Sequence, residues 1–375
     1  MMRVKNIAQL GIKELFSLKA DPVLLLLIIY IFSVAVYTVA TGVNFEVKNA
    51  SVAVVDDDNS ALSRQITASL LAPEFQPAVR IAASRMNEVL DNGEFVFVLV
   101  FPPDFERDLL QGKQPEVQLN VDASAMTQAG NGAVYIQQII LAEAIHALAP
   151  TLNFADQLPV KISVRKLFNP NSSSAWFNSV MQVINSVTML GIILTGAALI
   201  REREHGTIEH LLVMPVTPAE IMLAKIWANG LVILIATLLS LWLVVNKLLA
   251  VPIHGSVTLF ALASALYLFS VTSLGIMLGT LTRSMAQFGL LIIPVVVIMY
   301  LLSGGTTPQE SMPDALRWIM QLSPSTHFVS LAQDILYRGA GFESVWPLLL
   351  ILLAIGAVFF SVALARFRKA IVSMG

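Results

Sequence analysis

Six apolar stretches of about twenty residues, none containing Asp, Glu, Lys or Arg, constrain the fold of this chain more than any other feature. A helix rises 1.5 Å per residue, so crossing a ~30 Å hydrocarbon core takes about 20 residues. We therefore predict an α-helical polytopic membrane protein with six transmembrane helices, at residues 22–42, 176–200, 226–246, 257–282, 284–303 and 345–365.

The overall composition agrees with a chain that largely faces lipid. Charged residues make up 13% of the sequence, about half the share in a soluble globular protein, and the mean hydropathy is +0.74. A net charge of -2 lacks the basic excess that nucleic-acid binding requires. The absence of cysteine excludes disulfides, thiolate metal sites and cysteine nucleophiles.

One polar segment, residues 43–175, interrupts this apolar chain and carries 24 of its 48 charged side chains. Short apolar runs alternate there with amphipathic stretches, which predicts a small α/β domain inserted between the first and second transmembrane helices. The expected strands are residues 52–55, 79–82, 95–101 and 117–121, and the expected helices are residues 60–71, 85–90, a segment after Asp104, and 127–149. Residues 160–168 are expected to return the chain to the membrane.

The Lys and Arg residues beside the spans predict the orientation, because short cytoplasmic loops carry an excess of them. With the N-terminus in the cytoplasm, eleven basic residues lie inside and three lie in the short outer loops, at Lys247, Arg317 and Arg338. Both termini, the loop 201–225 and the tail 366–375 are then cytoplasmic. The domain 43–175 and the segment 304–343 are then external, which means periplasmic in a bacterium.

The segment before the first span, residues 1–21, predicts an amphipathic helix lying in the cytoplasmic membrane interface. Val4, Ile7, Gly11, Leu15 and Leu18 share one helical face. A cleaved signal peptide is the alternative for the first span, but its apolar core is longer than the 7–15 residues of a signal sequence. We favour an uncleaved anchor.

Two acidic or histidine-containing clusters invite a metal site. Asp56, Asp57 and Asp58 could bind Ca²⁺, but the rest of the EF-hand pattern is absent, and a turn that caps a helix is the favoured interpretation. His205 and Glu209 lie four residues apart, but no His-Glu-x-x-His pattern is present. We predict no metal site and no catalytic site.

The loop 201–225 is the most specific part of the sequence. Gly206-Thr207 can end one helix and cap a short second helix that Pro215 ends. The residues that stand out are Glu202, Glu204, Gly206, Thr207, Glu209, Leu212, Pro215 and Glu220, followed by Lys225. This pattern resembles the cytoplasmic loop motif of ABC-2 type permeases, the membrane subunits of a class of ATP-driven exporters, except that Ala224 stands where the family usually has Gly.

A second stretch, after the fifth span, also resembles that family. The matching positions include Ser303, Gly304, Pro308, Pro313 and Pro324. The resemblance implies that residues 304–343 form short re-entrant helices that cap the outer mouth. It also implies that the loop 201–225 holds a coupling helix that docks on a separate ATPase subunit.

The chain itself is not expected to be an enzyme. Leu302 to Thr306 resembles the signature loop of an ATPase, but a nucleotide-hydrolysing domain also needs a Gly-x-x-x-x-Gly-Lys-Ser/Thr phosphate loop. The only Gly-Lys pair, Gly112-Lys113, lacks the earlier glycine and the following hydroxyl residue. We expect no directly bound cofactor, with ATP and Mg²⁺ held by the partner ATPase.

Three amides recur on one face of the second span, at Asn178, Gln182 and Asn185. Polar groups are costly against lipid, so this stripe predicts either hydrogen bonding between helices or the lining of a transport pathway. Gly275 and Gly279 form a GxxxG pattern that suits close packing, within one chain or between two. The lack of charged residues in the spans argues against a proton antiporter.

The resemblance therefore implies a permease subunit in a bacterial inner membrane that exports an amphipathic or hydrophobic, drug-like or lipid-like substrate. The expected partners are a cytoplasmic ABC ATPase, a second permease chain as a homodimer or similar paralogue, and a periplasmic adaptor protein. The alternative is a membrane-anchored receptor or scaffold whose external α/β domain binds a ligand.

Overall fold

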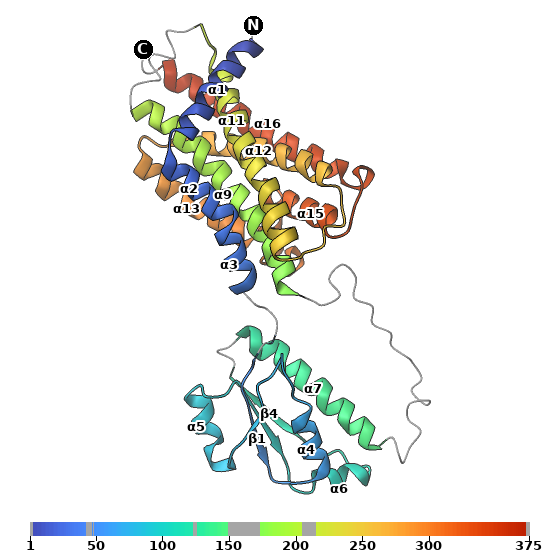
Figure 1. The fold of residues 1–375 in the computed structure, drawn as a ribbon. Helices are drawn as coiled ribbons and strands as arrows, with labels where there is room; N and C mark the ends of the chain where they lie inside the picture. The colour runs from blue at the N-terminus through green and yellow to red at the C-terminus, as the bar shows by residue number, and fades with distance from the viewer. Residues whose placement is uncertain are drawn as a thin grey trace. The chain divides into compact units, whose positions relative to one another are not determined.

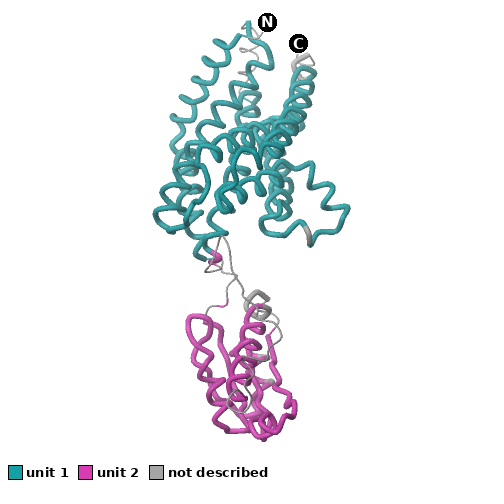
Figure 2. The backbone as a smooth tube through the Cα atoms, turned by 90° about the vertical axis from the view of Figure 1, so that its right-hand side faces the viewer, with its two compact units in different colours: residues 1–42, 175–375 teal, residues 43–174 magenta. Residues whose placement is uncertain are grey.

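The computed structural model describes residues 3–42, 47, 49–122, 126–148, 173–204 and 215–372. The chain divides into two compact units, one formed by residues 1–42 with 175–375 and the other by residues 43–174 (Figure 2). The first unit is helical and the second contains a β-sheet. Each unit is described on its own below.

The helical unit is a bundle whose first and last helices, α1 and α16, have their outer ends at the same end of the bundle (Figure 1). Helix α1 lies beside α11, and α16 runs along α12. Its elements are α1 (Val4–Lys19), α2 (Pro22–Phe32), α3 (Val34–Gly42), α9 (Ser174–Glu204), α11 (Pro218–Ser240), the π-helical continuation η2 (Leu241–Leu248), α12 (Val257–Leu281), α13 (Met285–Leu301), η3 (Gln309–Ser311), α14 (Asp314–Met320), α15 (Pro324–Leu336) and α16 (Phe342–Val372).

Within the described residues, five helical segments are long and apolar enough to cross a membrane, whereas the sequence predicted six. The five are Pro22–Gly42, Ser174–Glu204, Pro218–Leu248, Val257–Leu281 and Phe342–Lys369. The expected span at 284–303 forms α13, an apolar helix of 17 residues. Helix α13 is short because Ser284 caps its start and Gly304, with a φ of 94°, lies in the turn beyond its end.

Several helices begin where their capping residues dictate. Asp21 accepts a hydrogen bond from the Leu24 amide at 3.1 Å, and Pro22 occupies the first helical turn of α2. Thr217 and Glu220 form a capping box at the start of α11. Local sequence therefore sets the ends of the helices that flank the predicted coupling loop.

The GxxxG pattern of α12 packs against α9 in the same chain. A Cβ atom on Gly275 would lie 2.5 Å from the carbonyl oxygen of Ile192, and one on Gly279 would lie 3.3 Å from that of Gly196. The Thr195 hydroxyl donates to the Thr272 carbonyl at 3.2 Å across this interface. The close approach that the pattern allows is thus used between two helices of one chain.

An aromatic stack joins three helices in the centre of the bundle. The rings of Tyr267 on α12 and Phe328 on α15 are parallel to within 9°, with centroids 4.0 Å apart. The Tyr267 hydroxyl lies 2.5 Å from the Thr188 hydroxyl of α9. Because both rings are fully buried, α15 belongs to the core of the bundle and is not a surface loop.

The second unit is built on a four-stranded sheet in the order β2-β1-β3-β4. Strand β1 pairs in parallel with β2 and β3, and β3 pairs antiparallel with β4. The strands lie at the positions expected from the sequence: β1 (Val52–Asp56), β2 (Val79–Arg80), β3 (Phe97–Phe101) and β4 (Gln118–Val121). The helical elements are α4 (Ala61–Ala68), η1 (Ala83–Arg85), α5 (Met86–Asp91), α6 (Phe105–Leu110) and α7 (Met126–Leu148).

Helices cover both faces of this sheet. Alternate strand residues such as Val54 and Leu99 pack with Ile66 of α4 and Ile136 of α7. On the other face, Val55 and Val98 pack with α5. Both faces are buried, which is why β1 and β3 are continuous apolar runs in the sequence. The expected returning segment at 160–168 lies outside the described residues.

We predict that Gly275→Val destabilises the helical unit by about 1–3 kcal/mol, because the added side chain overlaps the α9 backbone. Its apparent melting temperature in detergent should fall by several degrees. The matched control is Gly289→Val in α13, where a Cβ meets nothing within 4 Å. Equal melting temperatures for the two variants would contradict the close packing of α9 on α12.

Candidate functional site

The predicted coupling loop is bounded by the charged end of α9 and by the capped start of α11. The structure describes Glu202, Glu204, Pro215 and Glu220. The other predicted coupling residues lie outside the described residues; these are Gly206, Thr207, Glu209 and Leu212. The site is therefore built from its two ends.

A buried lysine ties three helices together at this end of the bundle. Lys225 of α11 is 2% exposed, and its Nζ lies 2.6 Å from Glu14 Oε1 of α1 and 2.9 Å from Glu202 Oε1 of α9. A charge removed from water must be paired with opposite charge to be tolerated. Separating any of these helices would therefore expose or orphan a buried charge.

The last turn of α9 makes further polar contacts with the connection between α12 and α13. An Arg203 guanidinium nitrogen donates to the Thr282 carbonyl at 2.7 Å. Glu204 Oε1 accepts from the Met285 amide at 2.9 Å, at the first residue of α13. A carboxylate is favourable at a helix N-terminus, so Glu204 both fixes the end of α9 and caps α13.

The start of α11 is tied to the N-terminal helix. The side chain of Glu220 is almost fully buried and accepts from the Thr217 amide at 2.7 Å and from the Arg3 amide at 2.5 Å. The Asn6 amide group donates to the Pro215 carbonyl at 3.4 Å. Glu220 and Pro215, both predicted coupling residues, thus connect the loop end to the beginning of α1.

The apolar face of α1 packs on α11. Gly11 lies under the indole of Trp227, whose Nε1 donates to the Ile7 carbonyl at 3.1 Å. Leu18 on the same face is also buried, whereas Val4 is 79% exposed. The helix predicted for the membrane interface therefore uses much of its apolar face for contacts within the chain.

Apolar contacts support the same region from the other side. Leu199 near the end of α9 and Met222 near the start of α11 form a buried cluster with Ala363 and Phe367 of α16. Charged and apolar contacts together fix both loop ends to α1, α12, α13 and α16.

Sequence reasoning identified Lys225 only as part of a motif and did not include Glu14. The two residues are 211 positions apart, and no local pattern links them. The available signal was the position of Glu14 on an otherwise apolar, basic helix, where a carboxylate needs a partner.

The predicted polar stripe of α9 is divided by the structure. Gln182 and Asn185 line a groove of about 220 Å³ between α9 and α13, together with Met189, Val296 and Tyr300. Asn178 is buried nearer the start of α9 and is not part of the groove lining. Two of the three amides therefore share one surface.

The predicted cap residues lie on the connections from α13 through η3 and α14 to α15. Ser303 is buried, Gly304 packs against the Gln309 side chain, and Pro308, Pro313 and Pro324 immediately precede or begin η3, α14 and α15.

This connecting segment is packed onto the start of α9. The next residue, Gly305, lies against the Met181 side chain of α9. The Tyr337 hydroxyl, just after α15, donates to the Trp176 carbonyl at 3.0 Å. The segment covers the end of α9 opposite to Glu202.

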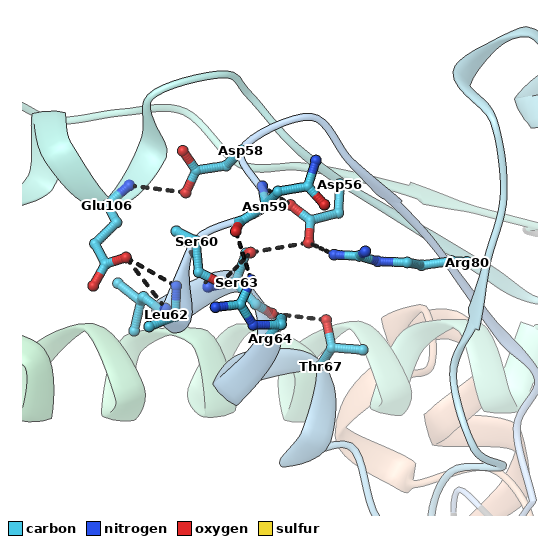
Figure 3. Close-up of polar contacts among 11 residues, drawn as sticks. Asp56, Asp58, Asn59, Ser60, Leu62, Ser63, Arg64, Thr67, Arg80 and Glu106 are labelled. Carbon is cyan, nitrogen blue, oxygen red and sulfur yellow. Dashed lines mark hydrogen bonds and ion pairs between the residues drawn. The ribbon is translucent and has the colours of Figure 1, made fainter.

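The acidic turn of the second unit forms helix caps and an ion pair (Figure 3). Asp56 accepts hydrogen bonds from the Asn59 amide at 2.9 Å and the Ser63 hydroxyl at 2.9 Å, and it pairs with Arg80. Asp58 accepts from the Glu106 amide at 3.2 Å. Burial raises the pKa of Asp56, but the hydrogen bonds and Arg80 outweigh burial and hold this pKa below its usual value.

These contacts agree with the interpretation of the turn as a cap. Within the described ranges, no three His, Asp or Glu side chains gather as metal ligands. His205, Glu209 and His210 lie outside those ranges.

We predict that Lys225→Met destabilises the helical unit by about 3–5 kcal/mol, because two buried carboxylates lose their shared cation. Adding Glu14→Gln and Glu202→Gln should restore most of the loss, as measured by thermal unfolding in detergent. The control is Lys247→Met, which removes an exposed lysine from the other end of the α11–η2 helix. If Lys225→Met melts like this control, the ion pairs do not hold the helices together.

Comparison with known proteins identifies the family. A family model described as "ABC-2 family transporter protein" matches residues 22–365. The chain is 53% identical over 374 residues, covering 100% of both chains, to the "Inner membrane transport permease YhhJ" of Escherichia coli K12. It is 29% identical over 364 residues to the "Probable multidrug ABC transporter permease YbhR" of the same organism, covering 95% of this chain and 96% of the relative.

These matches cover almost the whole chain, including the helices on both sides of the candidate site and the residues between them. They agree with the resemblance seen in the sequence motifs and with the apolar helices of the bundle. The chain therefore belongs to the ABC-2 family of transporters, as a multi-pass membrane permease.

Proposed function

We propose that this chain is the permease subunit of an ATP-driven exporter in a bacterial inner membrane. In this proposal the loop between α9 and α11 docks on a separate ATPase subunit. The observation that carries the proposal is the attachment of both loop ends to the bundle through Lys225, Glu204 and Glu220. Family membership implies an ATPase partner, and the name of the 53% identical relative supports the inner membrane.

The attachment explains how a force on the loop would reach the membrane helices. A loop held only by its peptide links would absorb a push by bending. Here the residue before the loop, Glu204, is bonded to the first residue of α13, and the capping residue Glu220 is bonded to the start of α1. A movement of the docked loop would therefore shift α1, α9, α11 and α13 as connected bodies.

The energy source must be the partner, because the sequence contains no Gly-x-x-x-x-Gly-Lys phosphate loop. ATP and Mg²⁺ would bind to the ATPase subunit. The permease would supply the loop that senses closure of the ATPase and the helices that respond.

The groove between α9 and α13 is the proposed substrate pathway. The amides of Gln182 and Asn185 can donate and accept hydrogen bonds, and Met189 and Val296 supply apolar walls. Such a surface suits an amphipathic molecule, drug-like or lipid-like. The relative named as a probable multidrug permease supports this substrate class.

A second permease chain would complete the pathway. The outward side chains of α13 include Leu290, 74% exposed, and Ile293, 59% exposed, on the helix that forms one wall of the groove. A second copy or a similar paralogue packed there would close the groove and bring a second coupling loop to a second ATPase. Lipid is the alternative neighbour of this helix.

The unit formed by residues 43–174 is proposed to be external, since eleven of the flanking basic residues then lie in the cytoplasm. Its position after the first membrane helix and its size suit contact with a periplasmic adaptor protein. A receptor or scaffold with an external ligand domain is the alternative function, and it would need no ATPase.

We predict that the wild-type chain, purified in mild detergent from its own bacterium, brings down a P-loop ATPase, and that Glu209→Arg abolishes this recovery. The reversed charge lies in the loop that should face the ATPase. The control is Glu343→Arg, an equal charge change at the start of α16, outside the loop. Recovery of the ATPase with Glu209→Arg, or its absence with wild type, would favour the scaffold alternative.

We also predict that Gln182→Leu changes efflux rate or substrate range while expression stays normal, because it removes an amide from the groove. Efflux of amphipathic dyes from cells measures this directly. Ser361→Leu is the control, since Ser361 is exposed on α16 and its hydroxyl bonds only the Ala357 carbonyl of its own helix at 2.7 Å. Unchanged transport by Gln182→Leu would remove the groove from the pathway.

A further inference from the structure

A second cavity, separate from the α9–α13 groove, opens between α1, α2, α9 and α11. It has a volume of about 300 Å³. Its deep wall is the buried group of Lys225, Glu14 and Glu202, and its outer wall carries Lys13, Ser17 and Arg201. No function proposed above uses Lys13, Ser17 or the cavity itself.

The charges of the cavity are arranged in two layers. In the deep layer Glu14 and Glu202 point to Lys225, at 2.6 and 2.9 Å, so the lysine is already matched by carboxylate. In the outer layer Lys13 is exposed, and Arg201 pairs with Asp21 at 3.6 Å. Such a partly exposed pair is weak, so the guanidinium can also serve an anion.

An apolar wall continues from the charged one. Leu18, Leu24 and Leu194 line the cavity beside the polar groups. Just outside it, Phe16 is 66% exposed and Val23 is 74% exposed, on either side of the turn from α1 into α2. A ligand that fits both walls carries an anionic group and hydrocarbon chains in one molecule.

The place of the cavity in the fold narrows the ligand further. It lies where the amphipathic helix α1 turns at Asp21-Pro22 into the first apolar helix of the span Pro22–Gly42. Such a turn marks the boundary between headgroups and hydrocarbon, where lipid phosphates are concentrated.

We propose that this cavity binds the phosphate group of a membrane phospholipid. The phosphate lies between Lys13, Ser17 and Arg201, and the acyl chains run along Leu24 and the exposed face of α2. The carboxylates of the deep layer keep the anion at the outer wall. The proposal uses the orientation given under the proposed function only to assign the cavity to the inner leaflet.

The bound lipid would fix the angle between α1 and α2. Helix α1 is joined through Glu14 to Lys225 and through Arg3 to Glu220, so this angle bears on the helices that flank the coupling loop. A headgroup in the cavity is thus a structural ligand of the loop mount and is distinct from a transported molecule in the α9–α13 groove.

The test is native mass spectrometry of the full chain in detergent, titrated with phosphatidylglycerol or with diacylglycerol of the same acyl chains. We expect phosphatidylglycerol to bind and diacylglycerol to bind at least about tenfold more weakly. The double variant Lys13→Gln, Arg201→Gln should weaken phosphatidylglycerol binding about tenfold or more, since each cation near a lipid surface contributes about fivefold. The matched control is Lys5→Gln, Lys19→Gln, which removes two exposed lysines of α1 that do not line the cavity.

Further arms keep the result unambiguous. If the double variant does not fold, Lys13→Gln alone should still weaken binding about fivefold, because Lys13 is exposed. Equal binding of diacylglycerol, or equal loss in the control variant, would overturn the proposal. Displacement of the lipid by millimolar inorganic phosphate would assign the cavity to free phosphate and overturn the lipid assignment. Capture of the ATPase is measured separately, so failure here leaves the proposed function standing.

Discussion

The part of the structure that flanks the predicted coupling loop depends on one buried cation. Lys225 is 2% exposed and can remain charged there only because Glu14 and Glu202 approach it from two other helices. The requirement to pair this charge joins α1, α9 and α11 into one body, although α1 is far from α11 in the sequence. Around this point the Glu220 contacts fix α1 further, and the Glu204 contact brings in α13.

From this mount the bundle continues as a tightly packed core. Glycines let α12 approach α9, and the Tyr267–Phe328 stack joins α12 to α15 at the other end of the bundle. In such a core small movements are transmitted as shifts of whole helices. The proposed pathway at Gln182 and Asn185 lies on α9 between the mount and the segment that covers the start of this helix.

Much of the fold could be predicted because its causes are local. The length of an uncharged apolar run follows from the thickness of the bilayer, and Thr217 and Asp21 cap helices wherever they occur. The short α13 was overestimated because apolar residues continue into the turn at Gly304, where the helix has ended. The Glu14–Lys225 pair could not be predicted because it joins distant segments. Helical periodicity placed Asn178 with Gln182 and Asn185, but only tertiary packing decides which of them line the groove.

The central claim is that the loop between α9 and α11 receives the ATPase, and the absence of cysteine makes a direct test possible. A single Thr207→Cys change supplies the only thiol of the chain, which can carry a short photo-activated cross-linker. The account predicts a cross-link to the ATPase whose yield changes when ATP is bound, and none from Ser311→Cys in the segment between α13 and α14. No cross-link from Thr207→Cys in a complex that still exports its substrate would contradict it.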